Sequence, residues 1–360
     1  MTLSAHHRAP ASTGTRADSA RRASESEAAQ GIDRWTNGGD ERHSGPMRIG
    51  IIGAGAIGGW VAAKLAAAGE DVALLARGAT AEALQGGLEL VERGVSTRVH
   101  PRVAASAEAL GRQDLLAIAV KAPALAEVAE AAAPMIGPDT IVLPMLNGVP
   151  WWFAGGEPLR SVDPGGAIAA ALPQNQVVGC VVHAACRRDA PARVVVAHAD
   201  KLILGEPEGG ATERVDRLCA LFGQAGIGCE ASDNIRRAIW YKLWGNATIN
   251  PLSALTLATA DRLLAECRSL LLAGMAELAA IGAAIGCPIS ESGEDRMAVT
   301  ARLGAFKTSM LQDVEAGRPI ELEALLGAPI ELARRAGIAT PTLDAIYAMT
   351  RLMATSRGLL

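Results

Sequence analysis

The segment Gly53-Ala54-Gly55-Ala56-Ile57-Gly58 places the tightest constraint on what this chain can fold into. It follows an apolar run at residues 49–52, which is typical of a short buried strand, and it opens a small-residue helical stretch that ends at Gly69. In that context the first glycine allows a tight turn, the second admits a pyrophosphate, and the third lets helix and strand pack closely. The segment therefore predicts a dinucleotide-binding βαβ unit with the helix N-terminus facing the phosphates.

The end of the second predicted strand, residues 72–76, indicates which dinucleotide is bound. NAD-binding proteins usually carry Asp or Glu about 20 residues beyond the glycines, where the carboxylate bonds the ribose 2′-hydroxyl. Here Arg77 follows the strand, and no carboxylate stands at that place. Because a guanidinium pairs bidentately with phosphate, Arg77 favours NADP and its 2′-phosphate. The alternative is a solvated arginine after a strand.

The periodicity of the chain predicts an α/β fold in two domains. Further strand patterns lie at residues 115–120, 140–143, 177–184, 194–197 and 201–205, of which the last three suggest antiparallel hairpins. After residue 232 only helical patterns remain, at residues 234–285, 294–316, 320–336 and from Pro341 onward. We therefore expect a Rossmann-type doubly wound sheet domain over residues 47–232 and an all-α domain over residues 233–360, with the functional site in the cleft between them. The length of 360 residues suits two domains of roughly 100–200 residues each.

Residues 1–46 differ in composition from the rest of the chain. They are rich in Ala, Ser, Arg, Thr and Gly and show no period of strand or helix. Their acidic residues argue against a mitochondrial presequence, and a secretory signal would have an apolar core. We expect either a disordered extension or an over-long start, with Met47, just before the first predicted strand, as the initiator.

Composition argues against several classes of partner. Thirty-four basic residues face 38 acidic ones without a basic run, so nucleic acid is not expected to bind. The longest apolar stretch, residues 270–289, is interrupted by Glu277 and does not reach the roughly 18 uncharged residues of a membrane span. The six cysteines include no CxxC pair, which favours reduced thiols in a cytoplasmic protein. Cys180, His183 and Cys186 would alternate between the faces of a strand, so no metal site is predicted.

A polar stripe is predicted on the helix that covers residues 235–250. Lys242, Asn246 and Asn250 recur every four residues and drift by only about 40° per step, which places them on one face. Two asparagines aligned with a lysine among apolar neighbours are costly as scaffold, but one cation and two amides suit a bound 2-oxo acid. The spacing alone leaves an exposed polar face as an equal alternative.

Several motifs resemble those of the ketopantoate reductase family (2-dehydropantoate 2-reductase, ApbA/PanE). The resemblance covers nearly everything from Met47 to the C-terminus, in order. The motifs are Val120-Lys121-Ala122, Leu146-Asn147-Gly148, Val182-His183-Ala184-Ala185 with Arg187-Arg188-Asp189 after it, Asn234-Ile235-Arg236, Trp240-Tyr241-Lys242-Leu243 with Asn246, Ile249-Asn250-Pro251-Leu252-Ser253-Ala254, Ser309-Met310-Leu311-Gln312-Asp313 and Gly317-Arg318-Pro319-Ile320-Glu321.

This resemblance implies NADPH-dependent reduction of 2-dehydropantoate to (R)-pantoate in pantothenate biosynthesis. Lys242 would be the catalytic lysine that protonates the C2 oxygen, and Glu321 would orient substrate and lysine. An ammonium beside the developing alkoxide stabilises its charge, and a nearby carboxylate favours the charged lysine. The remaining implied roles are cofactor binding by Lys121, Asn147 and Ala185, beside the glycine segment and Arg77, and substrate binding by Asn147, Asn246, Asn250 and Ser309.

Three positions depart from the family pattern. Ala124 stands where many members carry Gln, Ala260 where some carry a substrate-binding Asn, and Leu326 where Asn is usual. A reductase of another branched 2-oxo acid is therefore an alternative. A non-catalytic NADP-binding sensor is a second alternative, against which the full set of Lys242, Glu321 and the polar substrate residues argues. The sequence does not decide the oligomeric state, for which a homodimer is one option.

Overall fold

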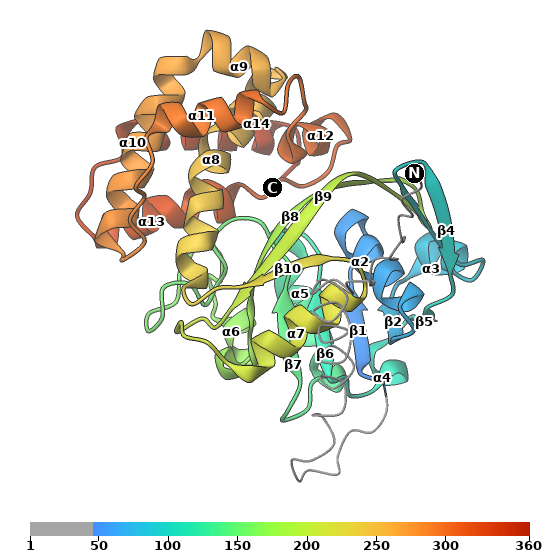
Figure 1. Cartoon of the computed structure of the whole chain (residues 1–360). Helices are drawn as coiled ribbons and strands as arrows, with labels where there is room; N and C mark the ends of the chain where they lie inside the picture. Colours follow the sequence, from blue (N-terminus) through green and yellow to red (C-terminus); the bar gives the residue numbers. More distant parts are fainter. Residues whose placement is uncertain (1–45) are drawn as a thin grey trace, which may run out of the picture. The chain divides into compact units, whose positions relative to one another are not determined.

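The computed structural model describes residues 46–360 (Figure 1). The expectation for residues 1–46, a disordered extension or an over-long start, therefore lies outside the described residues, Pro46 apart. The described chain runs from a parallel sheet with short helices into a long β-hairpin and then into a set of helices (Figure 1).

The first sheet has five strands, all parallel, in the order β5-β2-β1-β6-β7. The strands are β1 (Arg48–Ile52), β2 (Asp71–Leu75), β5 (Arg102–Ala104), β6 (Leu115–Ile118) and β7 (Ile141–Pro144). The helices between and after them are α2 (Ala56–Ala67), α3 (Gly78–Leu84), α4 (Ala107–Leu110), α5 (Leu125–Ala131) and α6 (Ala167–Ala171), with short turns η2 (Ala122–Ala124), η3 (Ala133–Met135) and η4 (Gln174–Gln176). The order reverses direction at β1, which makes its carboxyl end the place where a doubly wound sheet binds ligands. The predicted fold class is confirmed.

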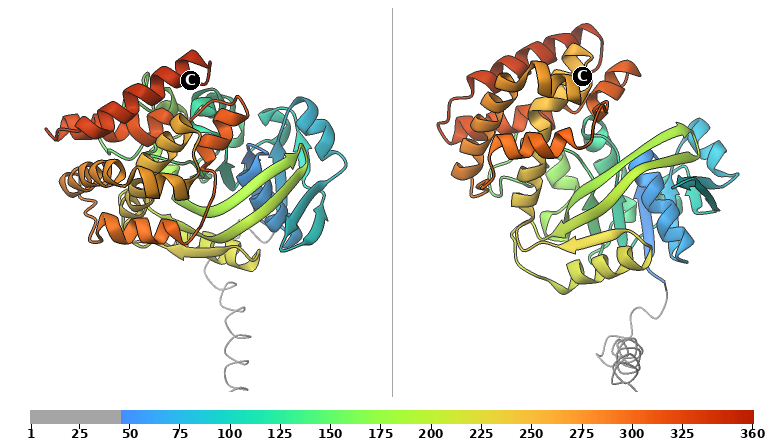
Figure 2. Two further views of the ribbon diagram at one scale, coloured as in Figure 1. Left: turned by 90° about the horizontal axis from the view of Figure 1, so that it is seen from above. Right: turned by 45° about the horizontal axis from the view of Figure 1, so that its top comes forward.

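The second sheet was only partly predicted from the sequence. Its strands are β3 (Leu88–Glu92), β4 (Val95–Val99), β8 (Gly179–Ala190), β9 (Arg193–Gly205) and β10 (Gly228–Ala231), and α7 (Glu213–Gln224) precedes β10. The prediction of separate short hairpin strands was wrong in detail, because β8 and β9 form one long antiparallel hairpin whose bulges shift its register. In Figure 2 this hairpin extends from the start of α8 (Ile235–Thr256) to α2 and β3, in agreement with its strand pairing and packing.

Helices make up the chain beyond β10, with α8 at their centre. They are α8, α9 (Ala260–Glu266), α10 (Arg268–Ala284), α11 (Gly293–Ala301), α12 (Ser309–Glu315), the π-helical turn η5 (Glu323–Gly327), α13 (Ala328–Arg335) and α14 (Pro341–Ser356). The continuous helical pattern expected over residues 234–285 is interrupted twice. Leu257, at φ 56°, ends α8 in a left-handed conformation, and α9 meets α10 at 95° near Cys267. These breaks allow α10, α12 and α14 all to pack on α8.

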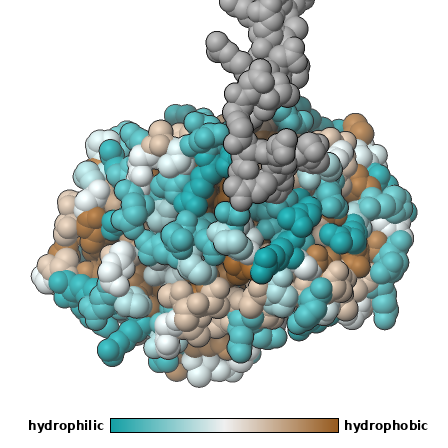
Figure 3. All heavy atoms as spheres, turned by 90° about the horizontal axis from the view of Figure 1, so that it is seen from below, coloured by the Kyte–Doolittle hydropathy of each residue, from teal (hydrophilic) through white to brown (hydrophobic). Residues whose placement is uncertain are grey.

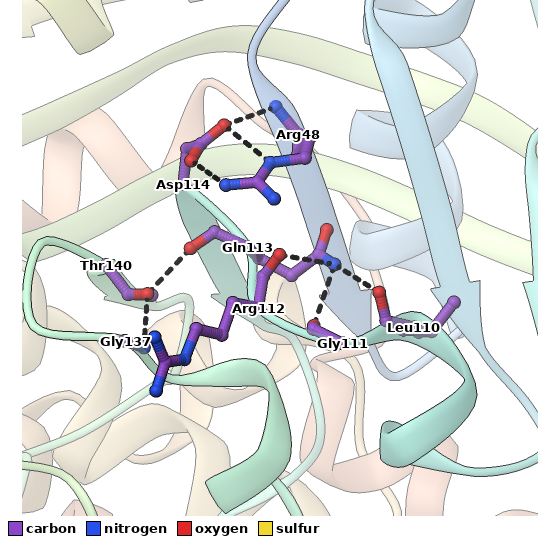
Figure 4. A network of polar contacts seen from close by, with 8 residues as sticks. All are labelled: Arg48, Leu110, Gly111, Arg112, Gln113, Asp114, Gly137 and Thr140. Carbon is purple, nitrogen blue, oxygen red and sulfur yellow. Dashed lines mark hydrogen bonds and ion pairs between the residues drawn. The ribbon is translucent and has the colours of Figure 1, made fainter. Parts of the chain in front are cut away.

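A network of polar contacts holds the amino ends of the central strands (Figure 4). The backbone N–H, Nε and Nη2 of Arg48 all donate to the carboxylate of Asp114. Next to it, the side-chain amide of Gln113 donates to three backbone carbonyls, and Thr140 Oγ1 donates to the Gln113 carbonyl at 2.6 Å. Because this edge is opposite the carboxyl ends of the strands, the network stabilises the sheet without occupying the ligand-binding side.

The exterior mixes polar and apolar side chains. On the face drawn in Figure 3, hydrophilic residues are interspersed with small hydrophobic patches, as is usual for a protein surface. Within residues 46–360 no single helix has the length and apolar composition to cross a membrane, although the bent pair α9–α10 meets both criteria when its two helices are taken together.

Candidate active site

The turn from β1 into α2, residues 53–58, contains three glycines. At two of them a Cβ would meet other protein atoms, and at the third the space is open. Gly53 has φ 102°, and a Cβ there would lie 2.7 Å from the backbone carbon of Ala119 at the end of β6. A Cβ on Gly58 would overlap the carbonyl oxygen of Gly53. Gly55, in contrast, has no atom within 4 Å of its Cβ position and leaves the first N–H groups of α2 without a side-chain cap. These amides are the groups that bind a pyrophosphate at a helix N-terminus.

A cavity of about 360 Å³ opens beside this turn. Its lining includes Ile52, Gly53, Ala54, Gly55, Leu75, Ala76, Arg77, Thr80, Val120, Glu127, Val128, Ala131 and Arg188. Arg77 reaches it from the N-terminus of α3, with its Nη1 3.9 Å from Glu127 Oε1 and both side chains exposed. The predicted glycine segment and Arg77 therefore share one cavity, which suits a dinucleotide with an additional phosphate.

Arg188 also lines this cavity, although the sequence analysis, which placed it in a family motif, gave it no role in the site. It lies on β8, and its Nη1 donates to the carbonyl oxygen of Ala54 at 3.3 Å. The two residues are 134 positions apart, and only the long β8–β9 hairpin brings them together. No local pattern in the sequence could have indicated this contact. The cavity thus carries two guanidinium groups together with free helix N–H groups, a set of donors that fits the phosphates of NADP.

Lys242 is held by residues from two distant parts of the chain. Its Nζ donates to Asn147 Oδ1 at 2.9 Å, in the loop after β7, and to the carbonyl oxygen of Val182 at 2.8 Å, on β8. Burial lowers the pKa of Lys242 to about 8, while Cys180 and Glu321 act in the opposite direction. Because burial raises the pKa of the Cys180 thiol to about 12, that thiol is neutral at pH 7. Glu321, in its ionised form, is therefore the group that favours the ammonium form of Lys242.

Glu321 is buried at the other side of Asn147. Its Oε1 accepts the backbone N–H of Ala122 at 3.2 Å. Burial raises the pKa of Glu321, opposed by that N–H, by the charge of Lys121 and by a hydrogen bond with Asn147. Asn147 thus bonds the ammonium of Lys242 and also lowers the pKa of Glu321, so it acts on both groups of the predicted catalytic pair.

The structure explains why glycine follows Asn147 in the Asn147-Gly148 motif. Gly148 has φ 83°, and a Cβ there would lie 2.5 Å from the carbonyl oxygen of Ala324 in η5. The same oxygen accepts the N–H of Val149 at 2.8 Å. The loop that carries Asn147 is therefore pressed against the turn that follows Glu321. π-Helical turns such as η5 occur often at functional sites.

The other predicted site residues are placed as follows. Lys121 forms an ion pair with the buried Asp313 of α12, the helix that begins with Ser309 and packs on α8. Asn246 and Asn250 lie on the same face of α8 as Lys242, and neither side chain hydrogen-bonds another residue in the described range 46–360. Their amides are thus available to a ligand. Ser309 and Ala185 are exposed, and no hydrogen bond or ion pair among the described residues ties their side chains to Lys242 or Glu321.

The three departures from the family pattern add no polar group at the site. Ala260 and Leu326 are fully buried, and the N–H of Ala260 donates to the Phe306 carbonyl at 2.9 Å. Ala124 lies in the η2 turn, two residues after the N–H that binds Glu321. No group of three or more metal-ligating side chains occurs in the described part of the chain.

Comparisons with known proteins point to one family. Two family models match, described as ketopantoate reductase PanE/ApbA over residues 49–209 and as its C-terminal part over residues 234–354. The 2-dehydropantoate 2-reductase of Mesorhizobium japonicum is 43% identical over 323 residues, which cover 87% of this chain and 99% of that protein. A ketopantoate reductase homologue from Ralstonia solanacearum MolK2 has a solved structure with a TM-score of 0.84 and 50% identity, covering 88% of this chain and all 100% of that one. The 2-dehydropantoate 2-reductase of Methylococcus capsulatus has a TM-score of 0.76 and 31% identity, covering 86% of this chain and 97% of its own.

Proposed function

The chain belongs to the ketopantoate reductase family, and we propose that it reduces 2-dehydropantoate to (R)-pantoate with NADPH in pantothenate biosynthesis. The observation that carries this proposal is the buried Lys242, held by Asn147 and the Val182 carbonyl, with Glu321 raising its pKa. A buried ammonium, an amide and a carboxylate joined in this way form a proton-donating site. This favours an enzyme over a non-catalytic NADP sensor, which has no use for a proton donor.

The cavity beside the glycine turn would hold the cofactor. The open side of Gly55 and the N–H groups of α2 would take the pyrophosphate, while Arg77 would take the 2′-phosphate and Arg188 would add a second cation. Lys121, Asn147 and the backbone of Ala185 are proposed for the nicotinamide-ribose side. When bound, NADPH supplies the hydride that adds to the C2 carbonyl carbon of the substrate.

Lys242 would donate the proton of the reaction to the C2 oxygen. An ammonium has three N–H groups, and two of them are taken by Asn147 and Val182, so the third remains for the substrate. A pKa of about 8 leaves Lys242 charged at neutral pH and yet a ready acid. Glu321 and Asn147 would orient it, which makes proton transfer depend on their positions as well.

Asn246, Asn250 and Ser309 would bind the polar groups of the substrate. The two amides have free hydrogen-bonding capacity one and two helical turns beyond Lys242. Pro251, inside α8, has no backbone N–H and so cannot donate to the carbonyl of Ala247. The alternative substrate is another branched 2-oxo acid, since the departures at Ala124, Ala260 and Leu326 remove polar groups.

The test is a panel of 2-oxo acids with the purified chain and NADPH. Loss of NADPH absorbance should be fastest with 2-dehydropantoate. A clear preference for a different branched 2-oxo acid would change the assigned substrate but leave the proposed mechanism unchanged. Absence of turnover with every acid, while NADPH still binds, would favour the sensor.

Domain limits, location and oligomeric state are further proposals. We propose that residues 47–232 form the NADP-binding domain and residues 233–360 the helical substrate domain, which the end of β10 at Ala231 and the start of α8 at Ile235 support.

A cytoplasmic location agrees with the six free cysteines. A homodimer is supported by the exposed apolar side chains Met349 and Leu352 on α14. Light scattering on the purified chain tests the oligomeric state.

A further inference from the structure

Arg296, on α11, has a guanidinium with unused hydrogen-bonding capacity. Its side chain is largely buried, and burial lowers its pKa. Its Nε is buried without any partner, and the one hydrogen bond of the group goes from Nη1 to Thr300 Oγ1 at 3.5 Å. Within residues 46–360 no carboxylate forms an ion pair with it. A guanidinium has five N–H donors and is charged at any ordinary pH, so a buried one without an acid partner is suited to an anion.

The guanidinium lies along α8, beside the proposed catalytic stripe. Its Cζ is 5.7 Å from the ring centre of Tyr241, the residue before Lys242. It also fills the space beside Gly245, the residue before Asn246, where a Cβ would overlap Nη2 and lie 2.7 Å from Cζ and Nε. Glycine is unfavourable in the middle of a helix. Gly245 is therefore explained by the close approach of Arg296 to the backbone of α8.

A second basic side chain connects Arg296 with the proton donor. His183 follows Val182, whose carbonyl oxygen accepts from Lys242. Burial is the main cause that lowers the pKa of His183, and the charges of Lys242, Lys201 and Arg296 lower it further, while Asp200 raises it. Lys242 and Arg296 thus both lower the pKa of the same imidazole, and Asp200 opposes them.

We propose that Arg296 binds the carboxylate of the substrate, while Lys242 protonates the oxygen on the adjacent carbon. The inference rests on the proposed function, because it assigns one group of the 2-oxo acid. In a 2-oxo acid the carboxylate carbon is bonded to C2. A cationic side chain that binds this carboxylate must therefore lie near the group that protonates the C2 oxygen. The planar guanidinium matches a carboxylate with two parallel hydrogen bonds, and stacking beside Tyr241 holds its orientation. Arg296 then selects acids over neutral 2-oxo compounds.

The test compares the 2-oxo acid with its methyl ester in wild type and in Arg296→Gln. The wild type should prefer the acid in kcat/KM, and the variant should lose roughly 10- to 100-fold of that preference, as expected for a charge-assisted pair. The loss should appear mainly in KM for the acid. Arg296→Lys should retain part of the preference. Arg302→Gln, at the exposed end of the same helix, is the matched control and should change nothing.

A structural role of Arg296 would lower the rates for acid and ester alike and leave their ratio unchanged, which would overturn the proposal. Failure of the proposed function gives a different result, since the wild type would then reduce no 2-oxo acid. In that case calorimetry with oxamate, a carboxylate analogue of 2-oxo acids, decides. If oxamate binds the wild type and binds Arg296→Gln at least tenfold more weakly, the carboxylate site is supported. If oxamate binds both proteins equally, or binds neither, the proposal is overturned.

Discussion

Gly148→Ala should damage the fold and the site together, because Gly148 is where the Asn147 loop meets η5. The residue has φ 83°, which costs about 1–2 kcal/mol for a residue with a Cβ. The new Cβ would also lie 2.5 Å from the Ala324 carbonyl oxygen and 2.6 Å from its carbon, and backbone cannot move aside as a flexible side chain can. Overpacking of this kind adds typically 1–3 kcal/mol. The free energy of unfolding should therefore fall by about 2–5 kcal/mol.

Gly337→Ala is the matched control for this prediction. Gly337 has φ 69° but no atom within 4 Å of its Cβ position, so alanine there meets the backbone strain without the clash. Urea denaturation should show a loss of about 1–2 kcal/mol for Gly337→Ala and a clearly larger one for Gly148→Ala. Displacement of Asn147 by even about 1 Å should also lower turnover roughly 100-fold in Gly148→Ala alone. Equal losses of stability in both variants, with turnover preserved, would refute the reasoning.

Two further predictions concern the cofactor and the proton donor. Arg77→Ala should raise KM for NADPH far more than for NADH. The preference for NADPH should fall roughly 10- to 150-fold, because a charge-assisted hydrogen bond contributes about 1.5–3 kcal/mol. Equal effects on both cofactors would show that Arg77 does not bind the 2′-phosphate. The rate of reduction should fall as pH rises through about 8, since burial depresses the pKa of Lys242 to that value and only the ammonium can donate. A rate that stays constant to well above that pH would contradict the assignment of Lys242 as the acid.

The parts of the fold that local patterns determine were predicted from the sequence. The glycine turn, α2 and its end at Gly69 depend on neighbours within a few residues, and the structure has them as expected. Strands β3 and β4 were missed because β3 carries Glu89 and Glu92 among its apolar residues and β4 is largely exposed. The break after α8 was missed because Leu257, rather than Gly or Pro, adopts the left-handed conformation.

The candidate site shows the same division. The stripe of Lys242, Asn246 and Asn250 follows from helical spacing, which is a local property. The contacts that position the stripe are not local: Lys242 and Asn147 are 95 positions apart, and Ala122 and Glu321 are 199 positions apart. Arg188 reaches the cofactor cavity only through the β8–β9 hairpin, and Arg296 reaches Gly245 only through the packing of α11 beside α8. A single sequence carries no signal for such pairs, since they depend on the tertiary fold.

The central claim is that Lys242 donates the proton, and single-turnover reduction by Lys242→Ala tests it most directly. General acid catalysis contributes about 10²–10⁴-fold, so turnover should fall by at least that factor, while NADPH binding followed by fluorescence changes little. Lys201→Ala, which removes a lysine on β9 paired with Glu230, is the control and should retain full turnover. If Lys242→Ala kept more than about a tenth of the wild-type turnover, the proton would have to come from water or another group, and the role given to Lys242 would be wrong.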